Sequence, residues 1–416
     1  MVTFMFLVVV GFLIWLQCKR EKNLLNLVSV LAVPYLFNVF FNNYFFYQLG
    51  FYKINDDVLF MIMGSLVVFF LGTCFVSPGI MPVIHEEDNE KRFSQYDMDK
   101  MAVSLIIIAV IGLLRVCSMF VSGAFSGSRF VSAEGVAGSG IIGHLMLLSG
   151  SLTPIVFLYW LDHKEKISSL IAVVLMLLLH FSTFIKYHVI GTVISLFIFT
   201  LLYKKSFLRK GIFILLSTVI LLFTGNYFIG FVLRDMNIDS FFYIAHFWKY
   251  TAGSLIYDQY IFDPGLNVDL TLGYKLMGFI MALPNMFTGF LLGNDARMFP
   301  YVAMPMLPVS DIGELSNVTD AFGYLYPAKG ANVDILLYYL VIFFIGIIFS
   351  WIYVKAKEND NYFSPFIGNF LTYFVFLNFF GTFYINSGPW EMLIYSIVIP
   401  NLFLRKTNLS EGKIDI

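Results

Sequence analysis

The sequence predicts an all-α polytopic membrane protein with about eleven transmembrane helices and one large external loop. Hydrophobic residues make up 59% of the 416 residues and charged residues only 13%, about half of the charged share in soluble proteins. The apolar runs are near-continuous, and most approach the roughly 20 residues that a helix needs to cross a bilayer. They exclude a membrane β-barrel, whose strands would alternate over about 10 residues.

The expected spans follow the apolar runs in chain order, and each is bounded by a polar or charged stretch. Two of them, residues 167–184 and 189–203, are shorter than the rest. The candidate spans are residues 1–17, 24–46, 58–79, 101–121, 141–161, 167–184, 189–203, 211–232, 333–354, 363–384 and 389–404.

The placement of Lys and Arg predicts the orientation of the chain. Of the 26 basic residues, 17 fall in one set of alternate loops and the C-terminal tail, and eight fall in the other set. Since loops rich in Lys and Arg remain in the cytoplasm, the first set is expected inside. The N-terminus is then outside and the C-terminus cytoplasmic, in a multi-pass membrane protein.

Residues 234–332 form the long polar segment between the spans and are expected to be the external loop. They separate an N-terminal bundle of about eight spans, residues 1–233, from the closing spans and tail, residues 333–416. Within the loop, residues 272–292 are apolar, but Pro284 in their middle breaks or kinks a helix. We expect a re-entrant or interfacial helical hairpin there, on the outer face.

Several cations lie on the outer side and are candidates to bind phosphate groups. Arginine grips phosphate through a bidentate fork, and lysine acts as a point charge. Each also has an ordinary structural explanation, such as snorkelling to the interface or anchoring a helix end. The candidate diphosphate-binding residues are Arg115, Arg129, Lys186, Arg234 and Arg297. Lys249 and Lys275 are instead expected on the solvated or interfacial face of the loop.

General bases are sought among His188, His246, Asp320 and Glu314, and the sequence does not choose between them. His180, inside the sixth span, is expected to be a hydrogen-bonded packing residue. Asn317 and Tyr326, near the end of the loop, have the amide and aromatic groups that suit a sugar ring. No metal-binding carboxylate pair of the Asp-x-Asp type occurs in the outer loops, so no metal and no cofactor are expected.

The end of the loop and the order of the spans carry a resemblance to a known family. The stretch Asn317-Val-Thr-Asp320-Ala-Phe-Gly-Tyr-Leu-Tyr326 is followed at once by a span, and Tyr250-Thr-Ala-Gly-Ser-Leu-Ile-Tyr257 is a second, weaker match. With the large late loop, these features resemble the Wzy-type O-antigen and capsule repeat-unit polymerases. Lys186 and His188 stand where an arginine is expected in that family.

The resemblance implies a GT-C-like membrane glycosyltransferase in polysaccharide biosynthesis of the cell envelope, located in a bacterial inner (cytoplasmic) membrane. Donor and acceptor would be oligosaccharides linked to a polyprenyl diphosphate such as undecaprenyl diphosphate, joined by inverting, metal-independent transfer. A chain-length regulator and membrane lipid are the expected partners, and no nucleic acid. Two alternatives remain open, namely a flippase or transporter for the same lipid-linked sugars and an O-antigen ligase-type transferase.

Overall fold

The computed structural model describes residues 1–76, 95–122, 140–183, 186–204, 208–233, 240–263, 271–292, 304–327, 332–358 and 365–404. The chain divides into two compact units. The first unit consists of residues 1–81, 241–359 and 373–390, and the second of residues 82–240, 360–372 and 391–416.

The first unit is built around four long apolar helices. They are α1 (Val2–Glu21), α2 (Leu27–Tyr44), α3 (Asp56–Cys74) and α13 (Asn332–Glu358). Asparagine side chains begin two of them, since Asn26 accepts a hydrogen bond from the Ser29 N–H and Asn55 accepts one from the Val58 N–H. Such caps satisfy backbone donors that the first helical turn leaves without partners.

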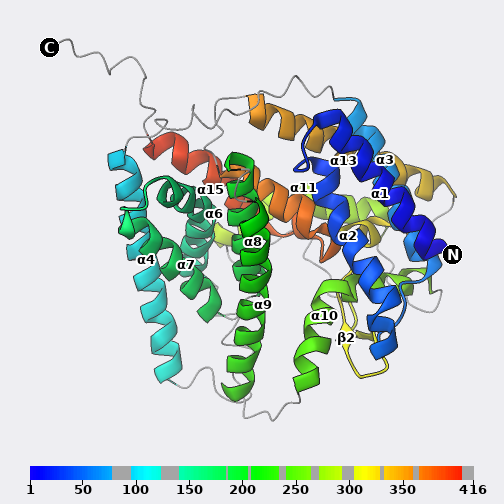
Figure 1. Ribbon diagram of the computed structural model, residues 1–416, viewed down its shortest axis with the longest axis horizontal. Coiled ribbons are helices and arrows are strands. Elements are labelled where there is room, and N and C mark those ends of the chain that lie inside the picture. Colours follow the sequence, from blue (N-terminus) through cyan, green and yellow to red (C-terminus); the bar gives the residue numbers. More distant parts are fainter. Residues whose placement is uncertain are drawn as a thin grey trace. The chain divides into compact units, whose positions relative to one another are not determined.

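Helices α3 and α13 lie side by side (Figure 1) and make the most extensive helix–helix contact in this unit. Gly72 and Gly346 face each other at the crossing, and a Cβ on Gly346 would lie 3.3 Å from the Gly72 Cα. Small residues at such a crossing let two membrane helices approach closely. The Ser65 and Tyr338 hydroxyls share a hydrogen bond of 2.6 Å along the same interface.

The described parts of the predicted external loop belong to the first unit and are largely helical. They comprise α10 (Ser240–Tyr257), the 3-10 helix η5 (Asp258–Phe262), α11 (Leu272–Leu292), strands β1 (Leu307–Pro308) and β2 (Leu315–Ser316), and α12 (Ala321–Leu325). The two strands pair antiparallel, with Leu307 opposite Ser316. The expected hairpin at Pro284 is wrong: α11 is one helix that contains the proline.

The second unit contains five helices among its described residues before the closing segment. They are α4 (Gln95–Val121), α6 (Gly140–Asp162), α7 (Ile167–Ser182), α8 (Lys186–Tyr203) and α9 (Leu208–Leu233). Successive helices pack on one another, as Figure 1 shows for α8 and α9. Polar side chains inside the unit bond one another or the backbone, for example Ser195 to the Asn369 side chain at 2.6 Å.

The predicted span 363–384 is not one regular helix. It consists of α14 (Phe366–Asn369), a π-helical turn η7 (Phe370–Val375), and the 3-10 turns η8 (Phe376–Phe379) and η9 (Phe383–Ile385). The chain then continues as α15 (Ser387–Phe403). Inside the segment the Asn378 amide donates to the Phe374 carbonyl, and such side-chain bonds compete with the regular helical ladder.

Six helices in the described part of the chain are long and apolar enough to cross a membrane, and shorter apolar helices accompany them. The six are α1, α2, α3, α4, α6 and α13. Their number and composition support the all-α, multi-pass membrane class that the sequence predicts.

Candidate functional site

Two buried carboxyl groups, Asp258 and Asp320, meet in the first unit and form the most unusual polar cluster of the described residues. Both side chains are 0% exposed. Asp258 is the first residue of η5, directly after α10, and Asp320 lies directly before α12. Sixty-two positions separate them in the chain, so the tertiary fold alone brings them together. Buried carboxyl groups are costly unless they are paired or protonated.

Asp320 has a local role that fixes its position. As the N-cap of α12 it accepts a short hydrogen bond from the Gly323 N–H. Burial raises the pKa of Asp320 to about 6, although interactions with the Asp258 carboxyl group, the Gly323 and Phe322 backbone and the Tyr35 side chain oppose the rise. A carboxyl group with such a pKa exchanges its proton near neutral pH, as a general base must.

Asp258 is held against the same short helix by steric fit. A Cβ placed on Gly323 would overlap the Asp258 carboxyl group, so this contact requires glycine. Among the described residues, no donor in good geometry satisfies either oxygen of Asp258, and the Asp320 carboxyl interacts with it directly. Burial and the negative charge of Asp320 raise the pKa of Asp258 well above its ordinary value. Since two adjacent carboxylates resist ionising together, the pair retains a proton.

Lys275 of α11 provides the nearby positive charge, and the expectation that it lies on the solvated or interfacial face of the loop is wrong. Its side chain is 3% exposed, and the Nζ atom donates a 2.7 Å hydrogen bond to the Tyr326 carbonyl. The lysine acts electrostatically on Asp258 and favours its ionised form. Its position in the predicted external loop suggested exposure, but the packing of α11 against α12 covers the lysine side chain.

Tyrosine hydroxyls from three further elements surround the pair. Tyr35 of α2 faces the Asp320 carboxyl, and Tyr384 of η9 donates a 2.9 Å hydrogen bond to the Ala321 carbonyl. The Tyr338 hydroxyl of α13 shares a hydrogen bond with the Ser65 hydroxyl and interacts electrostatically with Asp320. The carboxyl pair is therefore enclosed by neutral hydroxyl groups, with Lys275 as its cation among the described residues.

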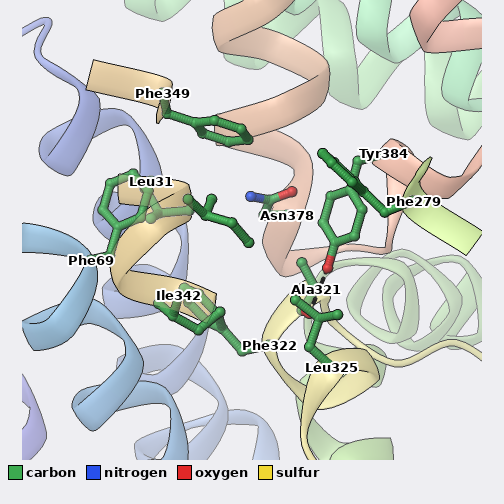
Figure 2. A pocket seen from close by; sticks show the side chains of 11 residues that line it. Leu31, Phe69, Phe279, Ala321, Phe322, Leu325, Ile342, Phe349, Asn378 and Tyr384 are labelled. Carbon is green, nitrogen blue, oxygen red and sulfur yellow. Dashed lines mark hydrogen bonds between the residues drawn. The ribbon is translucent and has the colours of Figure 1, made fainter. Parts of the chain in front are cut away.

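An apolar pocket begins one residue beyond Asp320. Figure 2 shows its lining side chains, with the Tyr384 hydroxyl bonded to Ala321 and the Asn378 amide among the aliphatic and aromatic groups. The Asn378 Oδ1 atom is buried and accepts no hydrogen bond from the described residues. The pocket has a volume of about 20 Å³, little more than one water molecule needs, so it has room for only a small group. It is lined by Leu31, Phe69, Phe279, Ala321, Phe322, Leu325, Ile342, Ile345, Phe349, Asn378 and Tyr384.

His246 and Glu314, two of the predicted bases, are paired with each other in the first unit. The His246 Nδ1 atom lies 3.2 Å from a Glu314 carboxylate oxygen, and the Lys249 Nζ atom lies 3.2 Å from the same oxygen. Burial opposes ionisation of Glu314, but His246 and Lys249 outweigh it and lower the pKa of Glu314. The lowered pKa makes Glu314 a weak base. Lys249, expected on a solvated face, is mostly covered because it pairs with Glu314.

His188, the third candidate base that the sequence offered, lies in the second unit beside His180. The two rings are 6.0 Å apart between centroids, and both side chains are buried. Neither ring nitrogen of His180 has a hydrogen-bond partner among the described residues, so this part of the chain gives its expected hydrogen bonding no support. Gly150 of α6 packs closely against the His180 ring, because a Cβ there would lie 3.0 Å from the His180 Nε2 atom.

The remaining predicted binding residues are only partly described. Arg115 is half-buried in α4, and Asn317 and Tyr326 are half-buried near α12. Lys186 begins α8, but its side chain lies outside the described residues. Arg129, Arg234 and Arg297 also lie outside the described residues.

Sequence reasoning therefore found Asp320 but missed its two partners, Asp258 and Lys275. One signal was present: Asp258 directly follows the Tyr250–Tyr257 stretch, and Gly323 lies three residues after Asp320. Within the described part of the chain, no group of three or more His, Cys, Asp and Glu residues forms a cluster that suits a metal ion.

Comparisons of the chain with protein-family models, curated proteins and solved structures found no match. A functional assignment therefore depends on the chemistry of the site itself.

Proposed function

We propose that the protein is a membrane glycosyltransferase that joins polyprenyl-diphosphate-linked oligosaccharide repeat units into a surface polysaccharide. The observation that carries this proposal is the buried Asp258–Asp320 pair at the start of α12. Asp320 lies in the stretch that resembles the Wzy-type polymerases, and its pKa of about 6 suits a general base at neutral pH.

In the proposed reaction, a hydroxyl group of the acceptor sugar attacks the anomeric carbon of the donor. The new C–O bond forms as the bond from that carbon to the diphosphate oxygen breaks, and the configuration inverts. The hydroxyl proton passes to Asp320, and the polyprenyl diphosphate leaves with the bonding electrons. Asp258 keeps the shared proton on its own carboxyl group, so that Asp320 is the ionised member of the pair.

Positive charge must stabilise the diphosphate as it leaves. The candidates that the sequence offers for this charge are Arg115, Arg129, Lys186, Arg234 and Arg297. Arginine and lysine side chains provide such charge without a metal ion, which is consistent with a metal-independent transfer. Asn317 and Tyr326, close to Asp320 in sequence, are assigned to the sugar.

The finer topology also belongs to the proposal. The N-terminus is placed outside, the C-terminus in the cytoplasm, and the chain crosses a bacterial inner membrane about eleven times in a GT-C-like bundle. The distribution of Lys and Arg supports this orientation. Asp258 and Asp320 then lie on the outer side. Because both are fully buried, the acceptor reaches Asp320 only when a covering element such as α11 moves.

The direct test is purified protein in lipid vesicles with a polyprenyl-diphosphate oligosaccharide. The proposal expects a ladder of products that differ by one repeat unit, and release of polyprenyl diphosphate in proportion to the bonds formed. Chelation of divalent cations should leave the ladder unchanged. Transfer of a single oligosaccharide to a different lipid, with no ladder, would instead indicate the ligase-type reaction.

A second candidate is proton-coupled movement of the same lipid-linked sugars across the membrane. It is favoured by the same buried pair, because ionisable groups enclosed in membrane proteins often carry protons in transporters. Vesicles with a pH gradient separate the two functions. A flippase would move labelled lipid-linked sugar without joining it, whereas the proposed polymerase lengthens it without any gradient.

A further inference from the structure

The position of Lys275 relative to the two carboxyl groups is unusual. The lysine is almost fully buried and acts on Asp258 electrostatically, yet it forms no ion pair with a described carboxylate. Its Nζ atom is instead bonded to the Tyr326 carbonyl, 2.7 Å away. The Tyr324 ring centre lies 5.9 Å from the same atom. Lys275 is thus anchored to α12, the short helix that Asp320 caps at its other end.

The charges of this cluster do not balance without a proton. Ionised Asp258 and Asp320 bring two negative charges. Lys275 brings one positive charge near neutral pH, because burial lowers its pKa only to about 8 while the charge of Asp258 opposes the fall. A net charge in a buried site is costly, and groups in such sites neutralise by gaining or losing protons. One proton on the carboxyl pair makes the cluster neutral, whereas no proton or two protons leave it charged.

The other titratable groups that face the pair do not change this balance. Tyr35 comes from α2, Tyr338 from α13 and Tyr384 from η9, and each is neutral as a phenol near pH 7. Among the described residues, Lys275 of α11 is therefore the group that determines how many protons the pair holds.

We infer that Lys275 is a positioning residue whose buried ammonium group makes Asp258 and Asp320 hold a single proton between them. The inference deepens the proposed function, on which its activity readout rests, because one ionised carboxylate must remain as the base. Without the ammonium group, a neutral cluster requires two protons, and neither carboxyl group can then accept the proton of the acceptor hydroxyl.

The test compares Lys275→Met, which removes the charge, with Lys275→Arg, which retains it. Lys53→Met serves as the matched control, because Lys53 is exposed and lies over the Tyr47 ring. Polymer formation is measured against pH for each variant. The carbonyl stretch of protonated carboxyl groups is followed by infrared difference spectroscopy over the same pH range. An opposite charge within a few ångströms typically lowers a carboxyl pKa by about one to three units.

Lys275→Met is therefore expected to move the acid limb of the activity profile upward by at least about one unit. Its activity near neutral pH should fall about tenfold or more and recover at higher pH. The infrared spectrum should show one protonated Asp in the unmodified protein and two in Lys275→Met. Lys275→Arg and Lys53→Met should keep the original midpoint.

Three results would overturn the inference. One is an equal loss of activity by Lys275→Met at every pH, which indicates a purely structural role. Another is an unmodified protein without a protonated carboxyl band and with activity that requires Na⁺ at constant ionic strength, which indicates a bound cation. A third is two protonated groups near neutral pH while Lys275 is present. If Lys275→Met does not fold, the infrared titration of the unmodified protein still decides. An absence of polymer at all pH values would remove the proposed function but leave the spectroscopic test valid.

Discussion

The carboxyl pair of the first unit and the histidine pair of the second unit are built alike but differ in chemistry. Both pairs are buried beside a glycine. A Cβ on Gly323 would overlap the Asp258 carboxyl group, and a Cβ on Gly150 would lie 3.0 Å from the His180 Nε2 atom. A neutral imidazole needs no counter-ion, and the histidine pair can remain buried as it is. Two carboxylates need a proton and a cation, so their site retains a proton that can be exchanged. Burial therefore creates a candidate base in one unit and a packing contact in the other.

Substitution of one member of each pair tests this difference most directly. Asp320→Asn keeps an N-cap acceptor for the Gly323 N–H, so α12 should remain folded. It removes the base, and the rate of polymer formation should fall by about 10²–10⁴-fold. His188→Asn, assayed at matched protein level, should change the rate by far less. Loss of activity in His188→Asn with full activity in Asp320→Asn would assign the base to the histidine pair.

The protonation of Asp320 should also make the stability of the protein depend on pH. The pKa of Asp320 in the folded protein, about 6, lies above its ordinary value of 3.8. The folded state therefore binds this proton more tightly, and the resulting stability is fully present below about pH 4 and lost as pH rises through about 6. This shift of about two units corresponds to a contribution on the order of 3 kcal/mol.

Thermal unfolding in detergent at pH 5 and pH 7 measures this contribution. The unfolding temperature of the unmodified protein should be lower at pH 7 than at pH 5 because the pair loses a proton. The Asp320→Asn variant should show a smaller decrease. An identical pH dependence in both proteins would show that Asp320 is not protonated in the folded state.

The smallest expected difference comes from the two glycines. Gly323→Ala would force the Asp258 carboxyl group aside, and overpacking of this kind costs about 1–3 kcal/mol. Because it displaces Asp258, it should also lower activity. In Gly150→Ala the new Cβ would meet His180 and Thr192 at 3.0–3.2 Å, so stability should fall while activity per folded molecule remains unchanged. Activity and unfolding temperature of both variants provide the measurement.

The hydropathy of the sequence was enough to predict the membrane class and most of the helices. Helix α3 was expected at residues 58–79 and lies at Asp56–Cys74, and α13 was expected at 333–354 and lies at Asn332–Glu358. Hydropathy succeeds here because a long apolar run in a bilayer must form a helix to satisfy its backbone groups. It failed at residues 363–384, because composition does not reveal that side chains such as Asn378 bond the backbone and break the ladder.

The candidate site was decided mainly by tertiary structure. Asp320 was a candidate from its sequence context, and its role as a cap follows from local residues. Asp258 and Lys275 lie 62 and 45 positions earlier, and no local pattern predicts that α11 and α12 enclose them together. Their ionisation depends on burial and on one another, and both are properties of packed neighbours rather than of the residues alone. The sequence therefore determined which charged groups were present, and the tertiary structure decided which of them share a proton.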